Sequence, residues 1–131
     1  MAIQIDFKKA FDTLDWKFLL HVMRCFGFSK TFCDWIEDIL HSARISILLN
    51  GSLVGFFDYS RGVRQGDPLS PLHFDIAEDF LSRYLSSLCS FGALELSSVG
   101  RGLHTPSHLL YADDILIFLR ASTHNMESFK F

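Results

Sequence analysis

Two different periods of hydrophobic and polar residues alternate along this chain. A period of two over residues 3–7 (IQIDF) predicts a short strand that ends near Asp6. Helical spacing then occurs twice. The first helix is expected to be capped by Asp12 or Thr13 and to stop at Gly27, and the second is expected to begin at Ser29. Their predicted apolar stripes are Trp16, Leu19, Leu20 and Met23 in the first helix, and Phe32, Ile36, Ile39 and Leu40 in the second.

A hairpin and a long helix are predicted next. Residues 44–58 form two β-type runs around Asn50-Gly51, a pair that tolerates the positive φ angles of a type I′ turn. Ser70 as N-cap and Pro71 at the first helical position begin a helix that is expected to reach about Cys89. Asp75 falls on its polar face, while its predicted apolar face comprises Leu72, Ile76, Phe80, Tyr84 and Leu88, with Ala77, Leu81 and Leu85 beside them and His73 in their midst.

The last third of the chain predicts a loop, a second hairpin and a short helix. Residues 92–107 are rich in Gly and Ser and indicate a loop or weak strand. Residues 109–119 place two short apolar strands around the Asp113-Asp114 turn, and Ser122 or Thr123 is expected to cap a final helix. This order predicts an α+β fold, a small antiparallel sheet packed on helices, with an additional hairpin at about residues 44–58.

Composition supports a packed domain. Of the 131 residues 49% are hydrophobic and 15% aromatic, and the formal charge is −3, so we expect one domain with a single core. The apolar runs are too short for a membrane span, and the N-terminus lacks a signal-peptide pattern, which favours an intracellular, nuclear or cytoplasmic location over secretion. The three cysteines exclude a disulfide scaffold, and their wide spacing favours ordinary core cysteines over a zinc site.

The residues with the clearest chemistry are three aspartates. Asp6 ends the predicted first strand, and Asp113 and Asp114 lie in the predicted turn of the second hairpin. Three carboxylates at strand ends suit a pair of Mg²⁺ ions, because magnesium prefers hard oxygen ligands and keeps open positions for phosphate groups. Taken alone, however, these residues favour a solvated turn and a strand-end acid, since Asp is common in turns.

The segments around the aspartates change that balance. Residues 6–12 (DFKKAFD), 61–71 (RGVRQGDPLSP) and 109–118 (LLYADDILIF) occur in the order of three motifs of reverse transcriptases. The chain resembles these enzymes from about Ile3 to Leu119. It is similar in particular to the reverse transcriptases of non-LTR, long-interspersed-element-type retrotransposons, especially those of plants.

The resemblance implies a polymerase palm fold and an RNA-directed DNA polymerase that uses two Mg²⁺ ions, for which Mn²⁺ can substitute. It implies that Asp6, Asp113 and Asp114 are catalytic and bind metal together with the backbone carbonyl of Phe7. It further implies nucleotide contacts by Phe11, Gln65, Gly66, Tyr111 and Ala112, and nucleic-acid contacts by Arg61, Arg64 and Pro68. Two alternatives stay open: Phe11 as an ordinary core residue, and Arg61 and Arg64 as solvated loop charges.

The resemblance also bears on domains and partners. Residues 1–131 are expected to form a single partial palm domain, without the N-terminal part of the fingers, the thumb or the endonuclease. Partners implied for the full-length ancestor are an RNA template, a DNA primer and deoxynucleoside triphosphates. An alternative is a truncated, inactive remnant or a domesticated module that binds nucleic acid or protein. The resemblance implies that the positions of His73 and Asp75 are usually aliphatic. His73 fits either a partnered buried histidine or decay of a retroelement copy.

Overall fold

The computed structural model describes residues 1–97 and 106–128, and the chain divides into two compact units. The first, here called the sheet unit, comprises Met1–Lys8 and Glu78–Phe131, and the second, the helical unit, comprises Lys9–Ala77. The long helix α4 (Ser70–Ser90) contributes its first residues to the helical unit and the rest to the sheet unit. Each unit is described by itself.

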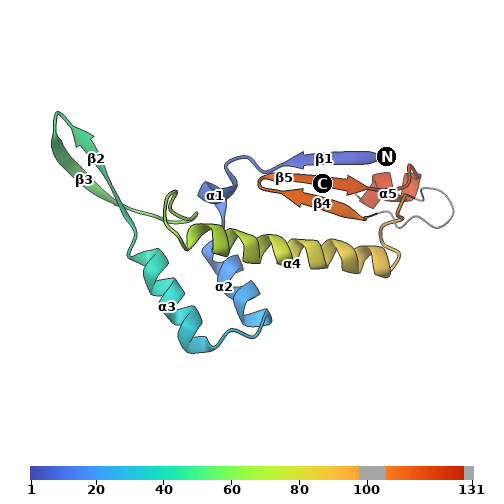
Figure 1. Cartoon of the computed structure of the whole chain (residues 1–131), viewed down its shortest axis with the longest axis horizontal. Helices are drawn as coiled ribbons and strands as arrows, with labels where there is room; N and C mark the ends of the chain where they lie inside the picture. The colour runs from blue at the N-terminus through green and yellow to red at the C-terminus, as the bar shows by residue number, and fades with distance from the viewer. Residues whose placement is uncertain (98–105, 129–131) are drawn as a thin grey trace. The chain divides into compact units, whose positions relative to one another are not determined.

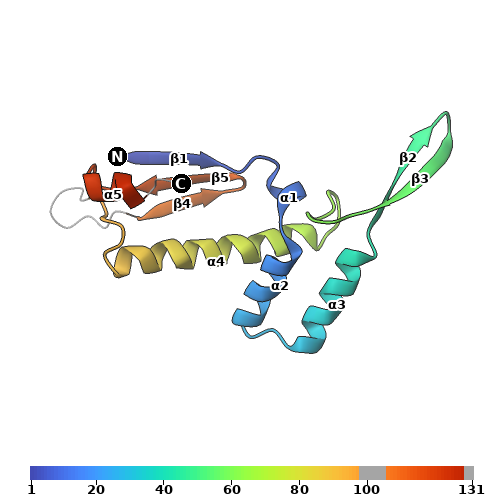
Figure 2. The same ribbon diagram turned by 180° about the vertical axis from the view of Figure 1, so that it is seen from behind.

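The sheet unit contains a three-stranded antiparallel sheet. Its strands are β1 (Ala2–Asp6), β4 (His108–Tyr111) and β5 (Asp114–Phe118), in the order β1-β5-β4. Figures 1 and 2 show the sheet alongside the C-terminal half of α4. Its core joins one face of the sheet to that helix and consists of Leu85, Leu94, Ile115, Ile117 and Leu119, with Ile3, Ile5, Leu81 and Leu88 packed against it.

A buried asparagine joins two segments of the sheet unit by hydrogen bonds. Asn125, in the short helix α5 (Thr123–Ser128), has no exposed surface. Its Nδ2 donates to the carbonyl oxygens of Glu95 and Arg120 at 2.9 and 2.8 Å, and its Oδ1 accepts the N–H of Glu95 at 2.9 Å. The predicted cap is confirmed, because Ser122 Oγ accepts the N–H of Asn125. Asn125 therefore ties the segment after α4 to the chain leaving β5.

The helical unit contains α1 (Ala10–Thr13), α2 (Trp16–Cys25), α3 (Lys30–His41), β2 (Arg44–Leu49) and β3 (Ser52–Asp58), followed by the first residues of α4. Its core has contributions from α2, α3 and the start of α4, and comprises Leu14, Trp16, Leu19, Leu20, Met23, Cys33, Ile36, Leu40, Val63 and Ala77. The described residues thus form two hydrophobic clusters rather than the single core expected. The assignment of residues 1–131 to one partial domain stays a prediction.

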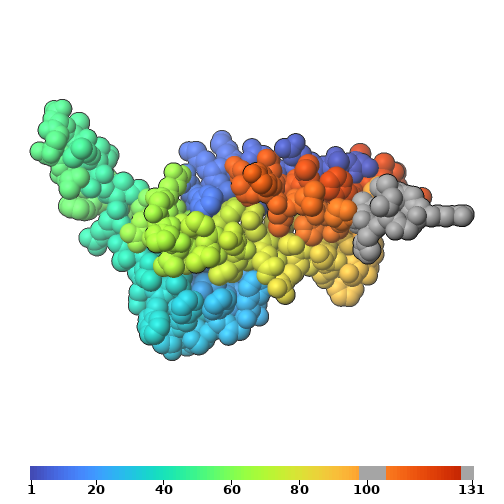
Figure 3. Space-filling view, in the orientation of Figure 1, coloured from blue at the N-terminus to red at the C-terminus, as the bar shows by residue number. Residues whose placement is uncertain are grey.

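The hairpin of β2 and β3 is confirmed. Asn50 and Gly51 have φ angles of 49° and 81°, as a type I′ turn requires. Every residue of β3 is exposed, including Phe56 at 71%. In the space-filling view of Figure 3 no other part of the helical unit covers the visible face of the hairpin.

Two helix details differ from the sequence predictions. Asp15, not Asp12 or Thr13, caps α2, with its carboxylate accepting the N–H of Phe18 at 2.8 Å. The reason is that Asp12 and Thr13 belong to the short helix α1, which ends before the extended Leu14. Ser29 is confirmed as the cap of α3, but Phe32 and Ile39 of the predicted stripe are more than one-third exposed, and Cys33 is buried instead.

Helix α4 begins at Ser70 as predicted, and its predicted apolar face is confirmed for Ala77, Leu81, Leu85 and Leu88 but wrong at both Leu72 and Tyr84. Leu72 and Tyr84 are 55% and 53% exposed, whereas His73 and Phe74 are buried. Helical period alone does not decide between adjacent faces when both carry large side chains, and here packing against two separate clusters decided it. Asp75 is exposed, as expected for the polar face.

The segment predicted as loop or weak strand is partly described. Leu96 forms an isolated antiparallel bridge with Leu119, and residues 98–105 lie outside the described residues. In the described part of the chain no helix has the length and apolar character needed to cross a membrane.

Candidate functional site

Asp6, Asp113 and Asp114, here called the acidic edge, lie at one end of the sheet. Asp6 is the last residue of β1 and is paired directly with Asp114, the first residue of β5. The N–H of Phe7 donates to the carbonyl oxygen of Asp113 at 2.8 Å. The first strand therefore pairs with the C-terminal hairpin, through β5.

Strand alternation explains why Asp6 and Asp114 project away from the core. Ile5 and Ile115 pack toward the core, so Gln4, Asp6 and Asp114 project from the opposite face of the sheet. Gln4 Nε2 donates to Asp114 Oδ1 at 3.1 Å, a contact the sequence analysis missed although the period of two puts both residues on this face. Like charges directly opposite in an antiparallel pair destabilise it, and a bound cation would relieve that repulsion.

The turn that carries Asp113 has an unusual backbone. Ala112 has φ 51°, in the left-handed region that costs a residue with a Cβ on the order of 1 kcal/mol. The preceding Tyr111 is 83% exposed. Strain of this kind persists only where the surroundings enforce it, and it is typical of functional sites.

The donor chemistry of the acidic edge fits magnesium. Among residues 1–97 and 106–128 there is no group of three or more His, Cys, Asp and Glu side chains that could hold a metal ion. Magnesium sites, however, are commonly built from one or two carboxylates that share the ion with substrate phosphates. The exposed carboxylates of Asp6 and Asp113 are of that kind.

The second set of predicted residues lies in the helical unit, on the loop of residues 61–67. The N–H groups of Gly62 and Val63 donate to the carbonyl oxygens of Leu14 and Phe11 at 2.7 and 2.8 Å. Trp16 Nε1 donates to the Gly62 carbonyl at 2.6 Å. Gly62 has φ +79°, and a Cβ there would lie 2.5 Å from a backbone oxygen of Asp12, so only glycine fits.

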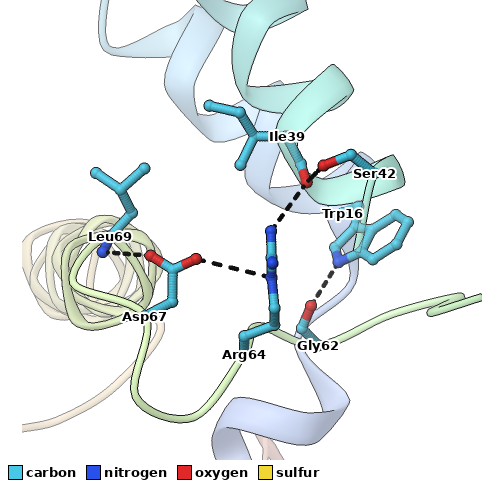
Figure 4. A network of polar contacts seen from close by, with 7 residues as sticks. All are labelled: Trp16, Ile39, Ser42, Gly62, Arg64, Asp67 and Leu69. Atoms are coloured by element: carbon cyan, nitrogen blue, oxygen red, sulfur yellow. Dashed lines mark hydrogen bonds and ion pairs between the residues drawn. The ribbon is translucent and has the colours of Figure 1, made fainter. Parts of the chain in front are cut away.

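Arg64 and Asp67 link this loop to two helices (Figure 4). Arg64 Nε lies 3.7 Å from Asp67 Oδ2, and Arg64 Nη2 donates to the Ile39 carbonyl in α3 at 3.5 Å. Asp67 Oδ1 accepts the N–H of Leu69 at 2.9 Å, one residue before α4. Arg64, expected to contact nucleic acid or water, is thus engaged within the chain.

The other loop residues face solvent. Arg61, Gln65, Gly66 and Pro68 are exposed. Gly66 has φ +88°, and a Cβ there would meet nothing within 4 Å. Gln65 Nε2 donates to Asp12 Oδ1 at 3.3 Å, and no sequence signal had identified Asp12 as its partner.

Phe11 is half-buried against the core of the helical unit. Its ring stacks on Phe74, with ring centroids 4.7 Å apart and 24° between the planes. This packing favours the core alternative for Phe11 while holding its ring in one orientation. The predicted residues therefore form two groups, the acidic edge with Phe7, Tyr111 and Ala112 in the sheet unit, and Phe11, Arg61, Arg64, Gln65, Gly66 and Pro68 in the helical unit.

His73 gives the helical unit a pH dependence. It is 4% exposed, and burial lowers its pKa, while the Asp67 carboxylate opposes part of that effect. The unfolded chain therefore binds a proton at His73 more readily than the folded chain. As far as His73 is concerned, the free energy of unfolding is expected to have its full value above about pH 6.5. It is expected to fall as the pH drops from there through the lowered folded-state pKa.

Urea unfolding at pH 7.5 and pH 5.5 measures this loss, and His73→Leu is expected to reduce it. His21→Leu, at an exposed position, is the matched control and should behave as the unchanged protein does. His108 contributes in the same direction, because burial lowers its pKa as well. An equal acid loss in the wild-type chain and in His73→Leu would contradict the prediction.

Comparison with known families gives a match over nearly the whole chain. The family model described as reverse transcriptase (RNA-dependent DNA polymerase) matches residues 1–130. That match spans both units and all three motifs noted in the sequence.

Individual relatives are proteins of transposable elements, two of them Pol polyproteins. The chain is 33% identical over 114 residues to the retrovirus-related Pol polyprotein from type-2 retrotransposable element R2DM of Drosophila melanogaster, which covers 87% of this chain and 10% of that protein. It is 37% identical over 80 residues to the Pol polyprotein from type-1 element R2 of Popillia japonica, covering 61% of the chain and 13% of the relative. It is 34% identical over 80 residues to an uncharacterized 149 kDa protein of transposon TX1 from Xenopus laevis, covering 60% and 6%. The matched segment spans about a tenth of the length of these three curated relatives.

Proposed function

Because the chain belongs to the reverse transcriptase (RNA-dependent DNA polymerase) family, we propose that it is the part of a non-LTR retrotransposon polymerase that carries the carboxylates for DNA synthesis on an RNA template. In this proposal residues 1–131 are a partial palm domain. The substrates are deoxynucleoside triphosphates, the partners are an RNA template and a DNA primer, and the reaction adds a nucleotide to the primer 3′-hydroxyl.

The observation that carries the proposal is the register of β1 and β5. Asp6 and Asp114 are 108 positions apart in sequence (114 − 6) yet directly opposite in the sheet, and Phe7 bonds to the backbone of Asp113. A structural role for these acids would not require like charges to face each other on an open surface. A role in binding cations explains the arrangement.

In the proposed site Asp6 and Asp113 hold two Mg²⁺ ions, with Asp114 and the carbonyl of Phe7 alongside, and Mn²⁺ can substitute. When bound, the ions supply charge stabilisation for the attacking 3′-hydroxyl oxygen and the departing pyrophosphate. The chain's own contribution is geometric. The strand pairing holds the carboxylates at fixed positions, and the Phe7 N–H to Asp113 carbonyl bond fixes the turn beside them.

Further roles follow for the residues that the family motif matches. The open backbone at Gly66 permits close approach of a nucleotide or template base next to Gln65. Arg61 and Pro68 are exposed for contact with template. Phe11, whose ring is held by Phe74, is proposed to exclude a ribose 2′-hydroxyl, and Tyr111 and Ala112 are proposed to lie against the nucleotide.

A segment exchange tests the proposal. Residues 1–131 replace the matching segment in the reverse transcriptase of an R2-type relative, and extension of a labelled DNA primer on an RNA template is measured with Mg²⁺ and with Mn²⁺. Template-dependent extension with either metal is expected. A folded exchanged enzyme that binds primer and template but extends nothing would favour the alternative of an inactive remnant.

Metal binding by the 131-residue chain alone is measured separately. Addition of Mn²⁺ is expected to broaden the amide NMR signals of Asp6, Phe7, Asp113 and Asp114 first. The matched control is Asp58, an exposed acid paired with Arg44 in the hairpin, whose signals should broaden only at higher concentration. Uniform broadening of all surface acids would count against a specific site.

A further inference from the structure

We propose that Arg64 is a positioning residue, which orients the Gln65-Gly66 turn by joining α3 to Asp67 at the start of α4, and that it is not a phosphate ligand. The catalytic consequence rests on the function proposed above for Gln65 and Gly66. The geometric claim does not, because it concerns contacts within the helical unit.

The first step is the engagement of the Arg64 side chain. Its Nη2 donates to the carbonyl of Ile39, which lies in the last turn of α3 and also accepts Ser42 Oγ at 2.7 Å. Carbonyl groups in the last turn of a helix have no partner in the helix and carry the negative end of its dipole, which favours a cation. Figure 4 shows the guanidinium between this carbonyl and Asp67.

The second step is the double engagement of Asp67. One carboxylate oxygen faces Arg64 Nε at 3.7 Å, and the other accepts the N–H of Leu69 at 2.9 Å. The Asp67 carbonyl accepts the N–H of Ser70, the first residue of α4, at 3.1 Å. Asp67 thus hydrogen-bonds the first residues of α4 and forms an ion pair with Arg64. Arg64 therefore connects the end of α3 to the segment that begins α4.

The third step concerns what lies between Arg64 and Asp67. The N–H of Asp67 donates to the Arg64 carbonyl at 3.3 Å, which closes a turn whose two central residues are Gln65 and Gly66. Nothing lies within 4 Å on the side of Gly66 where a Cβ would project, and the Gln65 side chain makes an exposed hydrogen bond to Asp12. The position of the turn therefore depends on its first and last residues, Arg64 and Asp67. The Arg64 side chain joins the first of them to α3 and, through Asp67, the last of them to the start of α4.

Arg61 provides the internal contrast. It lies on the same loop and is exposed, whereas the Arg64 side chain is 42% exposed and is directed at protein acceptors. A phosphate ligand must be accessible to the nucleic acid, and of these two arginines Arg61 is the more exposed residue. Arg64 requires the fork geometry of a guanidinium to reach a carbonyl and a carboxylate at once, which a lysine ammonium cannot reproduce.

Hydrogen exchange measured by mass spectrometry on the 131-residue chain tests the geometric claim at low micromolar concentration. Arg64→Gln and Arg64→Lys are both expected to speed exchange of the amides of residues 62–70 by about fivefold or more. Arg44→Gln, which breaks an exposed ion pair with Asp58 at 3.1 Å, is the matched control and should leave that segment unchanged. Wild-type exchange in Arg64→Gln, or in Arg64→Lys, would overturn the claim.

The catalytic consequence is tested by the kinetics of the exchanged polymerase, which is the R2-type reverse transcriptase that carries residues 1–131 in place of its own segment. Arg64→Lys is expected to lower kcat about tenfold with little change in template affinity, since the turn is misplaced while the charge is kept. Arg61→Gln should instead weaken template binding and reduce its salt dependence by about one counterion. If Arg64→Gln reduced the salt dependence as Arg61→Gln does, and Arg64→Lys behaved as wild type, Arg64 would be a phosphate ligand. An inactive exchanged enzyme with the expected hydrogen exchange would refute the proposed function and leave the positioning intact.

Discussion

Replacing Asp113 by asparagine in the exchanged polymerase is expected to lower the rate of primer extension at least about 1,000-fold, equivalent to roughly 4 kcal/mol of activation free energy. Asparagine keeps the size and shape of the side chain but removes its negative charge and one of its two acceptor oxygens. The backbone carbonyl of residue 113, which accepts the N–H of Phe7, is untouched. Strand pairing should therefore persist while the proposed metal ligand is lost.

The measurement is single-turnover extension with saturating primer, template and nucleotide. Asp58→Asn, an exposed aspartate of the hairpin, is the matched control for loss of one carboxylate and should change the rate less than about threefold. Thermal unfolding of both variants monitors the fold. An Asp113→Asn enzyme that keeps a tenth or more of the rate would contradict the proposed role of this carboxylate.

The 131-residue chain by itself is expected to extend no primer. Phosphoryl transfer at such a site depends on holding the triphosphate and the primer end in line as well as on charge stabilisation. The matched segment is about a tenth of the length of these relatives, and we propose that segments outside it hold the nucleotide and the duplex. Loss of an effective molarity of about 10⁵ M corresponds to roughly 7 kcal/mol of barrier, enough to hide a slow polymerase.

Extension of a labelled primer by the purified chain is measured on RNA and on DNA templates, with Mg²⁺ and with Mn²⁺. The exchanged polymerase serves as the positive control in the same assay. Extension by the isolated chain that disappears in Asp113→Asn would refute this prediction and show that these 131 residues suffice for catalysis.

Features that depend on a few neighbouring residues could be predicted from the sequence. Asn50-Gly51 predicted the hairpin turn, Ser29 the cap of α3 and Ser70-Pro71 the start of α4, because each requires only a local backbone conformation. The family was recognisable for a related reason. Its three motifs are short and their order is visible without knowing how they fold together.

Tertiary structure decided which residues those local elements contact. No pattern near Asp6 specifies Asp114 as its partner, because the pairing is set by the core that packs Ile5 and Ile115 on the other face of the sheet. Helical period likewise placed both His73 and Leu72 on the apolar face of α4, and packing buried His73 but left Leu72 exposed.

The same holds for polar side chains. Arg64 left two interpretations open in sequence, a phosphate contact or a solvated charge. Its structural partner is the carbonyl of Ile39, 25 residues away in the chain. Asn125 carried no signal at all, since its burial depends on the carbonyls of Glu95 and Arg120 reaching it. Local conformation is set by neighbours in sequence, whereas hydrogen-bond partners and buried faces are set by the long-range packing that only the folded chain provides.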